Sequence, residues 1–294
     1  MSSLRASGRR SVILFSKGGK NGATRSCYAV MMPAHGFTAV DQQADPEAWV
    51  AVLDKLSAEP FYAAYKKRSV ELLEPRDGAT YLDLGAGTGG DARLIKAQAK
   101  CSVVAADRSL SMAMACRARG GVPALVCDAA DLPFPAMTFD GCRGDRTLQH
   151  LQNPELAVAE MVRVTKVGGR VIVVDPDYGT QVMELPDQAL ARCVLRYRAD
   201  HMLRNGTIAH RSDSIFRDAG LSSVQVETMT LVVRDPRAVD NVMGLRTWAR
   251  TAAANGFLAP EDAERYEALF DETVRAERFL YSLIFFITSG MKVS

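Results

Sequence analysis

A glycine-rich stretch follows a strand-like segment early in the 294-residue chain. The residues LDLGAGTGG, 82–90, contain Gly85, Gly87, Gly89 and Gly90. Glycine lets a chain turn sharply from strand to helix and lets a ligand approach the backbone without Cβ atoms in the way. The first, second and fourth glycines fit the G-x-G-x-x-G pattern of dinucleotide-binding loops, and the first three fit G-x-G-x-G behind an acidic strand. The glycines predict a cofactor site but leave the cofactor open.

Three carboxylates lie at the expected ends of successive strands: Asp83, Asp107 and Asp128. Asp107 is compatible with both glycine patterns, because an acid about 20 residues after such a loop binds ribose hydroxyls. Asp83 lies two residues before Gly85. It favours a cationic ligand, since carboxylates attract a cation and a helix N-terminus does not. Asp128 can accept a hydrogen bond from an adenine amino group. Together the three acids favour a cationic nucleoside.

Short apolar runs alternate with helix-like segments in the first two thirds of the chain, which predicts a doubly wound α/β sheet. One helix start is well marked, with Asn153 as N-cap and Pro154 in the first turn, and Gly168-Gly169 is expected to end that helix. At least two helices are expected over 45–75. The predicted parallel strands are 79–87, 102–109, 123–130, 139–146 and 169–177.

The last third of the chain alternates less regularly. Residues 186–219 and 237–276 are expected to be helical, and 222–235 and 278–294 to form strands. We therefore expect a single domain over 45–294. Within it, 78–180 form the cofactor-binding core, 181–277 the substrate-cover helices and strand six, and 278–294 the last strand.

Residues 1–44 read as a basic N-terminal extension that we expect to be disordered. The chain has 36 Lys and Arg against 34 Asp and Glu, and residues 1–40 hold six of the basic residues and none of the acidic ones. Such a segment also resembles an organellar transit peptide. A cytoplasmic location is expected, or a mitochondrial one if 1–40 are a transit peptide. No apolar run is long enough for a membrane span, and the six cysteines form no metal-ligand pattern with the histidines, so no metal is expected.

Several motifs in a fixed order carry a family resemblance. YLDLGAGTGG, VVAADRS, LVCDAADLPFP and the segment from Phe139 to Asp177 resemble the successive motifs of class I S-adenosylmethionine-dependent methyltransferases. The most similar branch includes ubiquinone/menaquinone C-methyltransferases and natural-product methyltransferases. The resemblance implies S-adenosylmethionine as cofactor and a seven-stranded, mostly parallel sheet whose last strand is antiparallel beside the fifth. Val167 departs from the proline that this family has before Gly-Gly.

The resemblance also implies a role for each matched residue. The methionine part of the cofactor would lie along Asp83 and three loop glycines, the ribose at Asp107, and the adenine at Asp128 and Ala129, with Arg108 over one adenine face. The implied cofactor-binding residues are Asp83, Gly85, Gly87, Gly89, Asp107, Arg108, Asp128 and Ala129.

Methyl transfer from a sulfonium is an in-line displacement, so alignment of the reacting groups matters most. The catalytic candidates follow strands four and five: Asp145, His150 and Tyr178. Two of them have a structural alternative: Asp145 can form an ion pair with Arg146, and His150 can hydrogen-bond to the backbone. The substrate candidates are Tyr62, Tyr65, Gln149 and His201, and the two tyrosines could instead pack the N-terminal helix on the domain.

A small organic metabolite, as in secondary metabolism, is the expected substrate, and the alternative is a quinone precursor. A non-catalytic cofactor-binding protein and an NAD-dependent dehydrogenase are further alternatives. Nucleic acid is disfavoured, because the chain beyond residue 40 is mildly acidic and the segment after strand four reads GDRTLQ in place of the Asn/Asp-Pro-Pro-aromatic motif of base methyltransferases. A homo-oligomer remains open.

Overall fold

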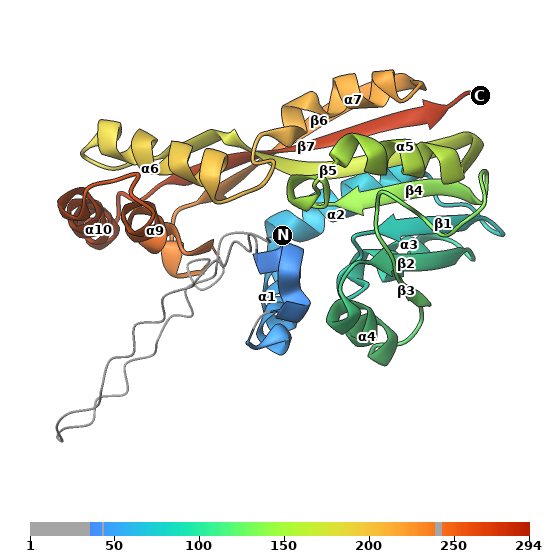
Figure 1. Ribbon diagram of the computed structural model, residues 1–294, viewed down its shortest axis with the longest axis horizontal. Helices are drawn as coiled ribbons and strands as arrows, with labels where there is room; N and C mark the ends of the chain where they lie inside the picture. The colour runs from blue at the N-terminus through green and yellow to red at the C-terminus, as the bar shows by residue number, and fades with distance from the viewer. Residues whose placement is uncertain (1–35, 43, 239–242) are drawn as a thin grey trace, which may run out of the picture. The chain divides into compact units, whose positions relative to one another are not determined.

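A computed structural model describes residues 36–42, 44–238 and 243–294 (Figure 1). In this part of the chain one sheet has the strand order β3-β2-β1-β4-β5-β7-β6. Strands β1 to β5 pair in parallel, and β7 is antiparallel to both β5 and β6. The predicted seven-stranded sheet is confirmed, with its last strand antiparallel beside the fifth. The strands are β1 Thr80–Leu84, β2 Ser102–Asp107, β3 Ala124–Val126, β4 Phe139–Asp145, β5 Thr165–Met183, β6 Leu221–Val233 and β7 Tyr281–Lys292.

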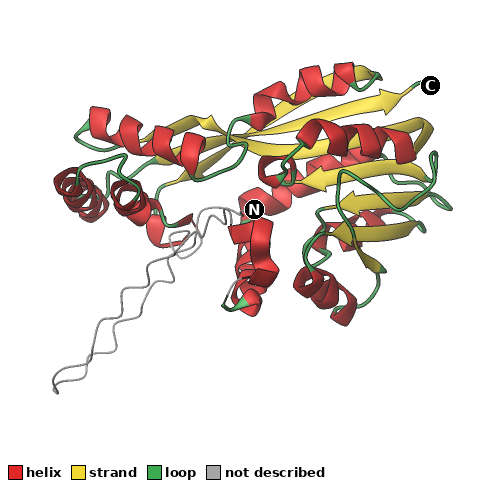
Figure 2. Ribbon diagram, viewed as in Figure 1, coloured by secondary structure: helices red, strands yellow, loops and turns green. Residues whose placement is uncertain are grey.

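Helices cover both faces of the sheet (Figure 2). Side chains alternate between the faces of a strand, and β5 shows this directly. Ile172 and Val174 pack in the core that includes α2 and α3, whereas Val171 and Val173 pack in the core that includes α5 and α7. The helices are α1 Pro46–Ala58, α2 Pro60–Leu73, α3 Gly90–Gln98, α4 Leu110–Ala118, α5 Pro154–Val164, α6 Gln188–His201, α7 Ser212–Asp218, α9 Trp248–Ala254 and α10 Pro260–Arg275.

Most of the predicted helical insertion packs as one group, whereas its helix α7 lies on the other face of the sheet with α5. Helices α6, α9 and α10 lie together in Figure 1 and share the core of the α2 and α3 face through Leu190, Trp248 and Tyr266. Short 3-10 turns join the elements of this half: η3 Ile208–Arg211, η4 Pro236–Ala238 and η5 Leu245–Thr247. Among the described residues, no helix is both long and apolar enough to cross a membrane.

The predicted limits of α5 were partly wrong. The helix begins at Pro154 as expected, but the Asn153 side chain makes no capping hydrogen bond. It ends at Val164, four residues before Gly168, because Thr165 is already extended and pairs with Phe139 of β4. Gly169 has another role, since a Cβ there would lie 2.6 Å from the Asp140 carbonyl oxygen. This glycine lets β5 approach β4.

Packed structure begins before the predicted domain boundary at residue 45. The 3-10 helix η1, Gly36–Gln42, buries Val40 beside Trp49 of α1. Its Asp41 carboxylate accepts hydrogen bonds from the backbone N–H groups of Leu110 and Ser111, at 2.8 and 3.0 Å. This segment therefore caps the N-terminus of α4. The rest of the predicted extension, residues 1–35, lies outside the described residues.

Candidate functional site

The glycine loop turns from β1 into α3 with three residues in the left-handed region. Gly85, Gly87 and Gly89 have φ values of 67°, 51° and 77°. A Cβ on Gly85 would lie 2.2 Å from the Thr147 Oγ1, and one on Gly89 would lie 2.3 Å from the Cys116 Sγ. Both the backbone conformation and the close neighbours therefore require glycine at these two positions.

Asp107 ties the loop to the end of β2. Its carboxylate accepts the Gly87 N–H at 2.7 Å and the Ser109 N–H at 2.9 Å. Burial raises the pKa of Asp107 above its usual value, and these backbone N–H groups oppose that shift. Asp107 therefore lies beside the glycine loop, as predicted from its spacing.

The predicted adenine-side residues lie at the neighbouring strand ends. Asp128 follows β3, is exposed, and accepts the Ala130 N–H at 2.9 Å, while Ala129 is buried. Arg108 is exposed directly after β2. With β3, β2 and β1 adjacent in the sheet, their carboxyl ends present these residues along one edge, where open α/β sheets bind ligands.

Behind the loop, Asp83 is buried against an arginine that the sequence analysis did not single out. Arg143 on β4 is fully buried, and its Nη1 lies 3.5 Å from the Asp83 Oδ1 and 2.9 Å from the Asp91 Oδ2. Burial raises the pKa of Asp83 to about 7, opposed by Arg143. Burial also acts on Asp91, but Arg143 and Lys66 hold its pKa well below the usual range. An arginine in the middle of a predicted buried strand was the sequence signal for this network.

Lys66 extends the network to α2 and to the end of β4. Its Nζ lies 2.7 Å from carboxylate oxygens of both Asp91 and Asp145. The Tyr65 hydroxyl donates to the same Asp145 oxygen at 3.2 Å. The Arg146 Nε is farther from it, at 3.9 Å. The main ion-pair partner of Asp145 is therefore Lys66, and its sequence neighbour Arg146 is more distant.

Two of the predicted substrate residues are packed in the core. Tyr62 and Tyr65 are 5% and 0% exposed, and both rings contact Phe285 of β7. Burial raises the pKa of Tyr62 to about 12. Arg146, with φ of 51°, places its guanidinium 5.1 Å from the Tyr62 ring centroid. These tyrosines support α2 against the sheet, which is the packing role weighed for them.

Three further candidates, His150, Gln149 and Tyr178, lie near the carboxyl ends of β4 and β5. His150 and Gln149 lie in the turn η2, Leu148–His150, where the His150 ring contacts Phe37 and the Gln149 N–H donates to the buried Asp175 at 3.2 Å. Burial raises the pKa of Asp175 well above its usual value. The prediction that Tyr178 follows the fifth strand was wrong: it lies within β5, which continues to Met183 because it pairs with β7. Tyr178 still lies near η2, since its N–H donates to the Gly206 carbonyl and the adjacent Asn205 N–H donates to the Gln149 carbonyl.

His201 belongs to a separate cluster. It is exposed at the end of α6, and its ring contacts those of Tyr197 and Phe257. Within the described residues, neither of these ring contacts involves the glycine loop or the ends of β4 and β5. The structure does not join this histidine to the other candidates.

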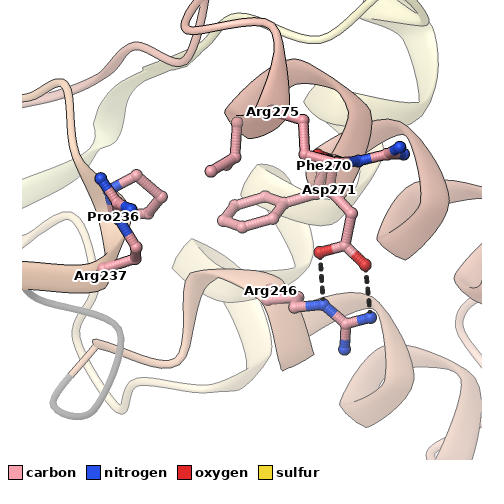
Figure 3. Close-up of a pocket in the computed structure, with 7 residues that line it drawn as sticks. Pro236, Arg237, Arg246, Phe270, Asp271 and Arg275 are labelled. Carbon is pink, nitrogen blue, oxygen red and sulfur yellow. Dashed lines mark hydrogen bonds and ion pairs between the residues drawn. The ribbon is translucent and has the colours of Figure 1, made fainter.

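A pocket on another part of the molecule contains none of the predicted site residues (Figure 3). It lies between η4, η5 and α10, where the Arg246 guanidinium makes two hydrogen bonds of 2.7 Å to the Asp271 carboxylate. Because Arg246 and Asp271 already pair with each other and no predicted site residue lines this pocket, we do not take it as the candidate site.

Comparisons with known proteins agree with this geometry. Residues 82–173 match the family described as "Methyltransferase domain". A phosphoethanolamine N-methyltransferase from Haemonchus contortus has the same fold, with a TM-score of 0.56 and 16% identity over 88% of this chain and 60% of that one. Residues 82–173 therefore form a methyltransferase domain, in agreement with the class I S-adenosylmethionine-dependent family that the motifs resemble.

Two proteins are similar to this chain in sequence. An uncharacterized 37.1 kDa protein in a transposon of Streptomyces fradiae is 33% identical over 74% of this chain and 65% of its own length. The ubiquinone/menaquinone biosynthesis C-methyltransferase of Burkholderia mallei is 36% identical over 42% of this chain and 54% of its own length. The chain thus spans less than two thirds of either relative.

The residues at the loop fit the cofactor that this class uses. The Asp83 Oδ2 is buried and has no hydrogen-bond partner among the described residues, so it can receive an ammonium group. A Cβ on Gly87 would lie 3.0 Å from the Leu53 Cδ1, which is tighter than an ordinary contact, so glycine is favoured at this position as well. Asp107, already held by two N–H groups, presents acceptor oxygens for hydroxyls.

Proposed function

We propose that the protein transfers a methyl group from S-adenosylmethionine to a small organic metabolite. The observation that carries the proposal is the placement of Asp83, the glycine loop and Asp107 at adjacent strand ends within the matched methyltransferase domain. When bound, the cofactor supplies an electrophilic methyl on a sulfonium. The chain would bind the ammonium at Asp83, the ribose at Asp107, and the adenine beside Asp128, Ala129 and Arg108.

The acceptor would lie beyond the ends of β4 and β5. His150 and Tyr178 border this region and could orient the acceptor atom, or remove its proton if it carries one. Asp145 is held by Lys66 and Tyr65, so we assign it a positioning role. We also propose a soluble enzyme of the cytoplasm that takes no nucleic acid.

A quinone-precursor C-methyltransferase is the second candidate, and the similarity to the Burkholderia mallei relative favours it. That match covers 42% of this chain. The two candidates share the cofactor and differ in the acceptor.

Isothermal titration calorimetry with S-adenosylmethionine and, separately, with NAD tests the proposal. We expect saturable binding of the methyl donor and none of NAD. Binding of NAD alone would replace the methyltransferase by a dehydrogenase. Incubation with labelled methyl donor and candidate metabolites would then find the acceptor, and binding without turnover of any acceptor would favour a non-catalytic role.

A further inference from the structure

Arg198 of α6 lies over two aromatic rings. Its guanidinium carbon is 5.2 Å from the centroid of the Tyr178 ring and 5.1 Å from that of Trp248. Trp248 is 2% exposed, and Tyr178 and Arg198 are half-buried. Stacking on aromatic faces holds a planar guanidinium in a fixed orientation and leaves the N–H groups at its edge free to donate.

No carboxylate neutralises this guanidinium within the described part of the chain. The buried Arg198 Nε has no hydrogen-bond partner there. The neighbouring surface residue Arg196, by contrast, pairs with Asp200 at 3.2 Å, and the partly buried Arg246 pairs with Asp271. A partly buried charge without a counter-charge is costly, so the Arg198 position favours an anion from outside the chain.

An aromatic side chain connects Arg198 with the proposed acceptor region. Tyr178, which lies under the Arg198 guanidinium, borders the proposed acceptor region. The Trp248 ring, also under this guanidinium, contacts the Tyr281 ring of β7, with 5.9 Å between the ring centroids. Arg198 is therefore next to the proposed acceptor region through its direct contact with Tyr178.

We propose that Arg198 binds an anionic group, a carboxylate or a phosphate, on the methyl acceptor. This inference rests on the proposed function and names the substrate class of the same site. A guanidinium fork matches either anion with two parallel N–H donors. A neutral quinone ring offers no such group, so an anionic acceptor also separates the two candidate functions.

Arg198 could serve only as packing between Tyr178 and Trp248, and anion titrations distinguish this role from binding. A Trp49→Phe background leaves Trp248 as the single tryptophan reporter, because the chain has two. Sodium pyrophosphate and sodium benzoate would be titrated separately at constant ionic strength while Trp248 emission is followed. The two probes distinguish a phosphate from a carboxylate group.

We expect a saturable emission change with at least one probe, with a midpoint at least about tenfold higher in Arg198→Gln. Such a ratio corresponds to about 1.4 kcal/mol, within the range of a charge-assisted hydrogen bond. Arg196→Gln, on the exposed side of the same helix, should keep the original midpoint. Arg198→Lys retains the charge without the planar fork and should give an intermediate value. No saturable change in the parent, or equal midpoints in the parent and Arg198→Gln, would overturn the proposal.

Thermal unfolding and S-adenosylmethionine calorimetry on the same variants complete the test. In the described part of the chain Arg198 makes no hydrogen bond or ion pair with the glycine loop, so cofactor affinity should stay within about twofold in Arg198→Gln. If Arg198→Gln unfolds, the comparison uses Arg198→Lys. Failure of the parent to bind S-adenosylmethionine would remove the proposed function, whereas anion binding lost only in Arg198 variants would still establish the anion site.

Discussion

Arg143 and Asp83 lie directly opposite each other on β4 and β1, and the Arg143 Nη1 is 3.5 Å from the Asp83 Oδ1. Both side chains are on the sheet face covered by α2 and α3. Lys66 and Asp91 join them there. A network of ionisable groups is thus buried directly behind the glycine loop. The balance between its positive and negative charges affects both the stability of the fold and the binding of a ligand at the loop.

Replacing Arg143 with methionine should destabilise the protein strongly. The substitution keeps an unbranched side chain but leaves Asp83 and Asp91 buried without this counter-charge, and removing one partner of a buried pair costs about 3–5 kcal/mol. Urea unfolding followed by circular dichroism measures the loss. Arg196→Met is the matched control, because Arg196 is 84% exposed and its surface pair contributes about 0–1 kcal/mol. A loss for Arg143→Met no larger than the control's would contradict a structural role for the network.

The protonation of Asp83 should make cofactor binding depend on pH. Burial raises the pKa of Asp83 to about 7, and only the ionised carboxylate attracts an ammonium group. Affinity for S-adenosylmethionine should therefore rise about tenfold from pH 6 to pH 8, as a single pKa near 7 requires. Calorimetry at several pH values gives this profile.

Asp83→Asn is the control for that profile. This variant should bind S-adenosylmethionine more weakly, and its affinity should depend less on pH. Any pH dependence that remains is due to titration of the ligand's own amino group. A parallel slope in both proteins would mean that Asp83 does not titrate. The same raised pKa also predicts a change in stability: the native state holds a proton that the unfolded state has released, so the Asp83 contribution to folding declines as pH rises from about 4 to about 7.

Much of the fold could be predicted because its signals are local. Apolar strand segments, the glycine loop and Asp107 each depend on residues close in sequence, and the structure places Asp107 against Gly87 as the spacing required. The buried network could not be predicted in the same way. Lys66 and Arg143 are 77 residues apart in number, and only the packing of α2 on β4 brings both to Asp91.

The aromatic candidates show a second limit. Tyr62 and Tyr65 have the same spacing whether they cover a ligand or pack a helix, and their contact with Phe285 comes from the far end of the chain. The end of α5 was misplaced for a similar reason: Thr165 leaves the helix to pair with β4, and a β-sheet partner is not visible in the helix's own sequence.

Replacing Asp107 with alanine should weaken cofactor binding. The substitution removes an acceptor for the ribose hydroxyls and also the acceptor that fixes the Gly87 N–H, and lost hydrogen bonds to a charged group cost about 1.5–3 kcal/mol. Calorimetric affinity for S-adenosylmethionine should fall by about 10- to 150-fold on that basis. Asp213→Ala is the control, since Asp213 lies on the surface of α7 and pairs with Arg217. An unchanged affinity in Asp107→Ala would show that the ribose assignment is wrong.

Replacing Asp41 with alanine should destabilise the protein through α4. The Asp41 carboxylate accepts two backbone N–H groups in the first turn of that helix and the Ser109 hydroxyl, and loss of a helix cap costs about 0.5–2 kcal/mol. Although burial opposes the shift, the hydrogen bonds to Ser111, Ser109 and Leu110 lower the pKa of Asp41. The contribution is therefore present above about pH 4, where the unfolded-state carboxylate is ionised, and is lost as pH falls through the lower native pKa.

The pH dependence makes this prediction specific to the carboxylate. Urea unfolding at pH 7 should separate Asp41→Ala from the parent by the cap's free energy, and the two curves should approach each other as the pH is lowered below about 4. Gln42→Ala, at the exposed neighbouring position, should match the parent at both pH values. A constant difference at all pH values would assign the loss to packing of η1 against α4, and no difference at pH 7 would show that η1 does not cap the helix in solution.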